Sequence, residues 1–293
     1  MSVAVFGLSI DSSFMPDLSR LFLLLHQQDE KIYIYKPFFD SIKSRCDKMP
    51  DIAGFFTFGY ELPESVRFLV SIGGDGTLLK SILTLKNKSL PVIGINTGRL
   101  GFLSAISRGD LEEAIQLLLS DRYDIEERSV LQFEDGTDLF GDFNYALNEI
   151  TVTKMDSSSM IKIHTYLNDE YLTTYWADGL IISTPTGSTA YSLSVGGPIL
   201  PPNSKSFVIT PIAPHNLTMR PIVVPDDNRI SLSVEGRGQQ FLCSLDSRSE
   251  AVNFPGKLVI SKANFSVKTV KLPGHGFFST LRNKLMWGTD RRN

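Results

Sequence analysis

The sequence predicts a parallel α/β domain, then a β-rich domain built as a sandwich of sheets, and a helix at the C-terminal end. Strand-like and helix-like segments alternate over residues 1–122, which indicates a parallel sheet covered by helices. Residues 123–274 show short runs with two-residue alternation, punctuated by Gly, Pro, Asn and Asp, which indicates antiparallel strands. A chain of 293 residues accommodates both domains.

Hydrophobic periodicity places the elements of the first domain. Its strands are apolar and partly β-branched, and its helices carry apolar residues at helical spacing. The expected strands are residues 3–7, 31–35, 67–72 and 91–95, and the expected helices are 16–28, 38–46, 77–83 and 110–119. Ligands of such sheets bind beyond the carboxyl ends of the strands, which is where Asp75 and Asn96 fall.

Alternating apolar residues place the strands of the second domain. The expected strands are residues 161–166, 180–183, 229–234 and 257–260, and the expected turns are 135–136, 168–169 and 225–228. Residues 277–287 return to helical spacing, and we expect the segment 275–293 to pack back on the first domain.

Composition narrows the possible partners. A formal net charge of −3, without a long basic run, argues against nucleic acid as the main partner. No apolar run is long enough to span a bilayer, so no membrane partner is expected. The only cysteines, Cys46 and Cys243, lack metal-ligand spacing, so no metal-ligating residues are identified. Two lone thiols indicate a reducing compartment, and the cytoplasm is the expected location.

A glycine-rich turn, Gly-Gly-Asp-Gly-Thr at residues 73–77, joins the strand 67–72 to the helix that follows. Glycines let a backbone approach closely, and the free N–H groups of a helix N-terminus favour a phosphate. A carboxylate there repels an anion unless it has a task, such as accepting a proton from a hydroxyl or holding a metal. In the alternative interpretation, Asp75 is only a helix N-cap. Neither of the common phosphate-binding glycine motifs is present.

The second domain carries a dense block of hydroxyl side chains between Asp178 and Pro198. A strand runs into this block, which offers many hydrogen-bond donors and acceptors without a charge that would repel an anion. The same hydroxyls could instead cap their own backbone. The pair Asn148-Glu149 follows an apolar run, and by itself it is more simply an exposed loop.

These segments together resemble the NAD kinase family. The resemblance rests on residues 73–77, on residues 94–98 with Leu100-Gly101-Phe102-Leu103, on Asn148-Glu149, and on the block from Asp178 to Pro198. It is extended by Pro214-His215 and Arg220-Pro221. The turn alone is moderately specific, because lipid kinases and phosphofructokinases carry similar turns. The long block ending in Gly196-Gly197-Pro198 is the most specific part.

The resemblance implies a kinase that uses ATP to phosphorylate the adenosine 2′-hydroxyl of NAD, giving NADP. It implies a Rossmann-like first domain, a β-sandwich second domain, a divalent metal such as Mg²⁺, and a homo-oligomer, dimer or tetramer. In the family the site lies between the domains, and a neighbouring subunit can complete it.

Residue roles follow from the motif positions. Asp75 would be the general base, with Glu149 as the rival base or metal-orienting carboxylate, and Lys80 would meet phosphate. Asn148 and Glu149 would hold the adenosine end of NAD. The candidate nucleotide-binding residues are Gly73, Gly74, Asp75, Gly76, Thr77, Lys80, Asn96, Asn148, Glu149, Asp178, Thr189, Ala190, Tyr191, Ser192, Ser194 and Arg248.

Three positions depart from the residues usual in the family: Ser159, Trp176 and Arg248. Because these positions usually touch the nucleotide, the departures bear on its detailed contacts and leave the reaction unaltered. Two other functions are weighed against this one. A lipid kinase would share the glycine turn but would bind membranes, and a silent NAD(P) sensor would have no use for Asp75.

Overall fold

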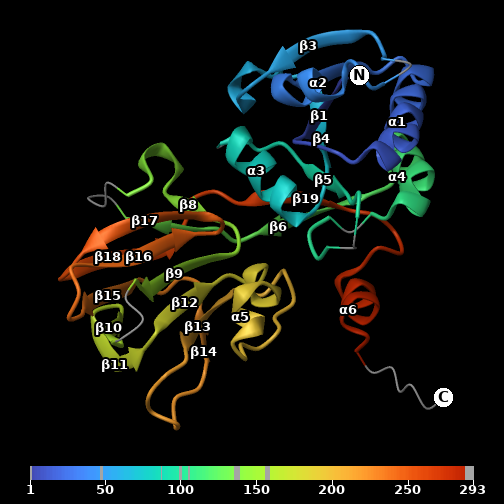
Figure 1. The fold of residues 1–293 in the computed structure, drawn as a ribbon. Coiled ribbons are helices and arrows are strands. Elements are labelled where there is room, and N and C mark those ends of the chain that lie inside the picture. The colour runs from blue at the N-terminus through green and yellow to red at the C-terminus, as the bar shows by residue number, and fades with distance from the viewer. Residues whose placement is uncertain are drawn as a thin grey trace. The chain divides into compact units, whose positions relative to one another are not determined.

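The computed structural model describes residues 2–46, 49–86, 88–98, 101–104, 106–134, 139–155 and 159–287. The chain divides into two compact units (Figure 1). The first unit contains the residues up to Glu127 and those from Lys268 onward, and the second unit runs from Arg128 to Val267.

A seven-stranded sheet forms the centre of the first unit, counted over the described residues, with the order β3-β2-β1-β4-β5-β19-β6. Its strands are β1 (Ser2–Gly7), β2 (Lys31–Tyr35), β3 (Ile52–Phe56), β4 (Val66–Ile72), β5 (Val92–Ile95), β6 (Asp124–Arg128) and β19 (Val267–Lys271). Neighbours from β3 to β19 pair in parallel, and this explains the continuous apolar runs of β1, β4 and β5.

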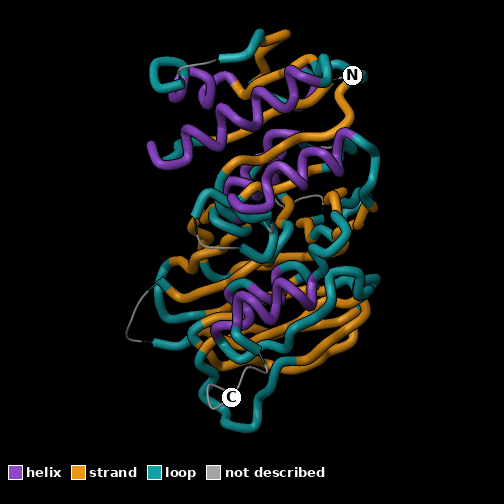
Figure 2. Tube along the Cα trace, turned by 90° about the vertical axis from the view of Figure 1, so that its right-hand side faces the viewer, coloured by secondary structure: helices purple, strands orange, loops and turns teal. Residues whose placement is uncertain are grey.

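The helices of this unit lie between its strands in the sequence or follow the last strand, and helices are drawn purple in Figure 2. They are α1 (Met15–Gln27), α2 (Lys36–Ile42), α3 (Asp75–Leu85), α4 (Leu111–Leu119) and, from the C-terminal end of the chain, α6 (Phe277–Leu285). Helices α1 and α4 lie against each other and share one hydrophobic cluster with alternate residues of β4, such as Phe68 and Val70. Helix α3 packs on β4 and β5 from outside that cluster, because successive strand residues point to opposite faces.

Two six-stranded antiparallel sheets build the second unit, again counted over the described residues. One sheet contains β11 (Glu170–Ala177), β10 (Ile161–Leu167), β15 (Ile230–Glu235), β18 (Gly256–Lys262), β7 (Leu131–Phe133) and β8 (Tyr145–Ala146), in that order. The other contains β14 (Ile222–Pro225), β13 (Ser206–Ile212), β12 (Gly179–Ser183), β9 (Glu149–Lys154), β16 (Gln240–Leu245) and β17 (Arg248–Asn253). A short helix, α5 (Tyr191–Ser194), follows β12.

The inner faces of the two sheets share one core. Ile163 and Leu232 of the first sheet belong to the same buried cluster as Ile182 and Phe241 of the second. This is the packing of a β-sandwich, in which every second residue of each strand points inward.

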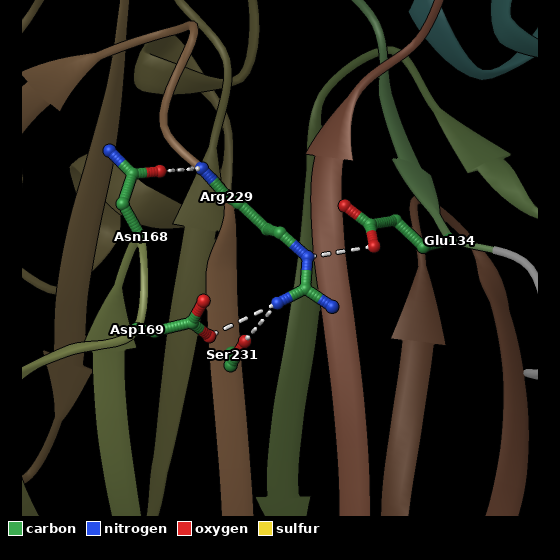
Figure 3. Close-up of polar contacts among 5 residues, drawn as sticks. All are labelled: Glu134, Asn168, Asp169, Arg229 and Ser231. Carbon is green, nitrogen blue, oxygen red and sulfur yellow. Dashed lines mark hydrogen bonds and ion pairs between the residues drawn. The ribbon is translucent and has the colours of Figure 1, made fainter.

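Figure 3 shows how Arg229 ties the hairpin turn between β10 and β11 to the sheet. Its Nε donates to Glu134 at 2.8 Å and its Nη1 donates to Asp169 at 3.3 Å. Its backbone N–H donates to the Asn168 side chain at 2.9 Å. Both turn residues have positive φ, 49° and 68°, which Asn and Asp tolerate better than most side chains. The partly exposed ion pairs fix the turn and contribute little stability.

The predicted fold class is confirmed, and two details differ from the expectations. Strand β3 was not predicted, because Gly54 interrupts its apolar pattern. Residues 123–127 and 268–274 were expected in the second domain, whereas they belong to the first unit, where β6 and β19 extend the sheet. The expected turn at 135–136 lies outside the described residues. Within the described ranges, no helix has the length and apolar character needed to cross a membrane.

Candidate functional site

The glycine-rich turn lies at the carboxyl end of β4, where the sequence predicted it. Gly73 has a φ of 150°, and a Cβ added there would lie 2.3 Å from the Thr77 hydroxyl oxygen, so only glycine fits. Its N–H donates to the Ile95 carbonyl of the neighbouring strand at 3.0 Å. Cβ atoms added to Gly74 or Gly76 would meet no atom within 4 Å, so the outer side of the turn is open.

The Asp75 carboxylate accepts hydrogen bonds from three consecutive backbone N–H groups. Phe102 donates to Oδ2 at 2.9 Å, and Leu103 and Ser104 donate to Oδ1 at 3.1 and 2.8 Å. Gly101 precedes this run, and a Cβ on it would lie 1.9 Å from Oδ1. The carboxylate is therefore fixed in position by the loop 101–104, whose glycine makes the close approach possible.

Asn96 stabilises the same loop. Its side-chain oxygen accepts the Gly98 N–H at 2.7 Å, and its amide donates to the Ser104 carbonyl at 3.4 Å. The residue is 2% exposed, so it supports the loop from inside. Of the resemblance segment 100–103, Leu100 lies outside the described residues.

Lys80 is not brought to Asp75. It is an exposed residue five positions further along α3, and an α-helix advances by 100° per residue, so the two side chains leave different faces. The geometry gives no support to the expected phosphate contact of Lys80.

In the second unit, Asp246 organises the Asn148-Glu149 pair. Its carboxylate accepts the N–H groups of Leu147 at 3.0 Å, Asn148 at 2.8 Å and Glu149 at 3.1 Å. Asp246 lies in the turn between β16 and β17 with a φ of 50°. Sequence reasoning missed this residue, and its φ, which suits Asp or Asn better than most residues, leaves little trace in the sequence.

Glu149 is a buried carboxyl group. Burial first, and then the charge of Asp246, raise its pKa from 4.5 to about 7, against the opposing effect of hydrogen bonds from the Ser192 and Tyr191 N–H groups. Its Oε2 is buried and has no hydrogen-bond partner among the described residues. A buried polar atom without a partner is costly, which singles out Oε2 as an atom available to a ligand.

Several hydroxyls of the block between Asp178 and Pro198 donate hydrogen bonds to backbone carbonyls of the protein itself. Thr184 donates to the Leu147 carbonyl at 2.6 Å, Ser188 donates to the Pro185 carbonyl at 2.6 Å, and Thr189 donates to the Thr186 carbonyl at 3.1 Å. The Thr184 bond joins the block to the segment just before Asn148. The capping interpretation therefore holds for these three hydroxyls.

The side chains that α5 contributes differ in exposure. Ser192 is buried and hydrogen-bonds Thr210 at 3.0 Å, whereas Tyr191 and Ser194 are exposed. Thr189 and Ala190, which precede α5, have intermediate exposure. Glu149 and α5 thus meet through backbone N–H groups, and the exposed side chains beside them are free to contact a ligand.

Family models match both parts of the chain. The ATP-NAD kinase N-terminal domain matches residues 43–123, and the ATP-NAD kinase C-terminal domain matches residues 147–272. The NAD kinases of Flavobacterium johnsoniae and Bacteroides fragilis are 45% and 46% identical to this chain over the full length of both proteins. The chain belongs to the ATP-NAD kinase family.

Solved structures of the family share the fold. A yeast NADH kinase complexed with NADH superposes with a TM-score of 0.84 at 22% identity, over 99% of this chain and 89% of that one. An Archaeoglobus fulgidus NAD kinase in complex with ATP gives 0.76 at 25% identity, over 98% and 99%. The resemblance to the NAD kinase family found in the sequence is thereby confirmed.

Two other residues expected at the nucleotide of an NAD kinase have partners within the protein. Asp178 pairs with Lys154 at 2.6 Å, at the opposite end of the paired strands β9 and β12 from Glu149. The Arg248 guanidinium donates to the carbonyls of Phe143 and Tyr145, and burial lowers its pKa. Arg248 therefore supports the chain that leads to Asn148.

The other two positions that depart from the residues usual in the family, Ser159 and Trp176, line one cavity. Lys162 and Glu235 also line it, and its volume is about 390 Å³. The Lys162 ammonium lies 4.7 Å from the Trp176 ring centroid, a cation–π contact that holds the half-exposed ring.

Gly101→Ala tests whether the loop 101–104 fixes the position of the Asp75 carboxylate. Because the added methyl would overlap Oδ1, we expect the carboxylate to move and turnover of NAD to fall by about 100-fold. Steady-state kinetics and a melting curve measure the effect. Gly109→Ala is the control, since its Cβ would lie 3.7 Å from the nearest atom. Parent-like turnover of Gly101→Ala would show that the fixed position of Asp75 does not matter.

Proposed function

We propose that Asp75 is the general base in the reaction of this NAD kinase, the ATP-dependent phosphorylation of NAD to NADP. The adenosine 2′-hydroxyl oxygen attacks the γ-phosphorus of ATP and forms a new O–P bond. The bond to the bridging oxygen breaks, ADP leaves with its electron pair, and the hydroxyl proton passes to Asp75. Such a base contributes on the order of 10²–10⁴-fold.

The hydrogen bonds of Asp75 carry this proposal. An ionised carboxylate offers about four acceptor positions, and three backbone N–H groups occupy three of them. Among the described residues, Oδ2 accepts a hydrogen bond from Phe102 alone, so one position on that oxygen remains for a hydroxyl. The side chain is 31% exposed, so a substrate can reach it. Glu149 stays the rival base, since its Oε2 has no hydrogen-bond partner in the part of the chain that the structure describes.

Further contacts are assigned to the remaining residues. We assign the NAD pyrophosphate to the open side of the turn at Gly74, Gly76 and Thr77, where a side chain would block the approach. We assign the adenosine end to Asn148 and Glu149, because Oε2 of Glu149 can accept from an exocyclic amine. The segment from Thr189 to Ser194 lies next to Glu149 and would contact the rest of NAD.

A divalent metal fits this protein as the companion of ATP. Among the described residues, no cluster of three His, Cys, Asp or Glu side chains could hold an ion. Mg²⁺ is commonly bound through substrate phosphates with one or two carboxylates. Asp75 of the first unit and Glu149 of the second are each a candidate carboxylate, and Mg²⁺, when bound, would neutralise the charge of the phosphates.

We also propose a homo-oligomer in which Asp178 serves the site of another subunit. Paired strands advance about 3.3 Å per residue, so five residues place Asp178 about 16 Å from Glu149. The edge strands β11 and β14 expose apolar residues, including Trp176 and Val223, as an interface would require. The cytoplasm remains the proposed compartment, and both cysteines are free and buried.

The reaction is tested with purified protein, MgATP and NAD, by coupling NADP to an NADP-specific dehydrogenase. We expect NADP to form, and Asp75→Asn to lower kcat by about 10²–10⁴-fold while NAD binding measured by calorimetry survives. In Asp75→Asn the side-chain amide nitrogen cannot accept the hydrogen bond from the Phe102 N–H, so the loop 101–104 is also disturbed. Gly101→Ala, which disturbs the loop and keeps the carboxylate, is the reference for that effect. NAD binding without turnover in the parent would identify a sensor. Retained turnover in Asp75→Asn would promote Glu149.

The raised pKa of Glu149 predicts a pH-dependent stability. The unfolded chain releases this proton near pH 4.5 and the folded protein holds it to about pH 7, so stability falls as pH rises between these values. The loss approaches about 3 kcal/mol above pH 7. Glu149→Gln removes this dependence, so its stability relative to the parent should rise from pH 5 to pH 8. Urea unfolding measures it, and equal pH slopes for both proteins would contradict the assignment.

Subunit mixing tests the role of Asp178. If sites are shared, Asp178→Ala and Asp75→Asn are each inactive alone, and their mixture regains activity after subunit exchange. One subunit then supplies an intact Asp178 to the intact Asp75 of the other. Light scattering gives the subunit number. A mixture that stays inactive although mixed oligomers form would place Asp178 outside the neighbouring site.

A further inference from the structure

The last helix of the chain brings a cation to the candidate base. Lys284, in the final turn of α6, places its Nζ 3.9 Å from Oδ2 of Asp75. The same ammonium lies 4.5 Å from the centroid of the Phe102 ring. Asp75, Phe102 and Lys284 therefore meet in the first unit, although they come from three distant parts of the sequence.

The Lys284 ammonium keeps its hydrogen-bond donors available. A separation of 3.9 Å is too long for a hydrogen bond, and three backbone N–H groups already engage the carboxylate. Among the described residues, the ammonium donates no hydrogen bond. Its side chain is 33% exposed, and the Phe102 ring holds it by a cation–π contact. It is thus a positioned charge with donors free for a ligand.

We propose that Lys284 binds the phosphoryl group that is transferred, as a catalytic residue supplied by α6. This rests on the proposed role of Asp75, because the γ-phosphate must approach the hydroxyl that Asp75 deprotonates. During transfer, charge is spread over the non-bridging oxygens of the γ-phosphate, and a fixed ammonium stabilises it. Lys284 gives up no proton, because the hydroxyl proton passes to Asp75.

The position of Lys284 also suits this role better than that of Lys80. Lys80 leaves a different face of α3, whereas Lys284 lies directly beside Oδ2, the oxygen with an acceptor position left. The ammonium is therefore placed where it could donate to a phosphate oxygen next to the hydroxyl that Asp75 deprotonates.

Lys284→Gln tests the proposal, with Arg282→Gln as the matched control on the same helix. Arg282 is an exposed cation in the same last turn. We expect Lys284→Gln to lower kcat about 100-fold, with an unchanged KM for NAD and an unchanged melting temperature. Lys284→Arg should recover part of the rate, because a guanidinium also donates to phosphate. Arg282→Gln should behave as the parent does.

The possible results separate this proposal from the previous one. Parent-like turnover of Lys284→Gln, with Asp75→Asn inactive, would overturn the role of Lys284 alone. Retained turnover in Asp75→Asn would instead overturn the general base. A Lys284→Gln variant faster than the parent would identify the contact as a brake and overturn phosphate binding. Equal losses in Lys284→Gln and Arg282→Gln, or a fall in melting temperature, would assign Lys284 a structural role.

Discussion

The three hydrogen bonds between Asp75 and the backbone of residues 102–104 are the interaction on which the first unit's site depends. They join the start of α3 to the loop that follows β5, and Asn96 stabilises that loop from inside. Hydrogen bonds to a charged group contribute about 1.5–3 kcal/mol each. The carboxylate that we propose as the general base is thus held by backbone donors, and among the described residues one of its acceptor positions is left open.

The second unit contains a similar arrangement, in which another carboxylate accepts three consecutive backbone N–H groups. Asp246 accepts the N–H groups of residues 147, 148 and 149, as Asp75 accepts those of 102, 103 and 104. Burial raises the pKa of the Asp246 carboxyl group. The charge of Asp246 in turn raises the pKa of Glu149. Asp246 therefore both holds the backbone of the Asn148-Glu149 pair and favours the protonated form of Glu149.

Much of the candidate site could be predicted from the sequence because its motifs are local. Residues 73–77 combine glycines that only a tight turn requires with a carboxylate that the turn alone does not explain. The phosphate contact of Lys80 stays a prediction, and its side chain leaves α3 on a different face from that of Asp75. Sequence reasoning did not single out Lys284 and Asp246, because each contacts a segment about a hundred or more residues away.

The sequence by itself determined the family, through the resemblance of its motifs. It also determined the fold class of each domain and the glycine-rich turn, because periodicity and backbone requirements are properties of short segments. Only the tertiary structure decided which groups meet the two carboxylates: a loop and a C-terminal lysine at Asp75, and Asp246 and the start of α5 at Glu149. These contacts depend on the packing of distant segments. Backbone N–H donors are present in almost every residue, so the sequence carries no mark of those that are used.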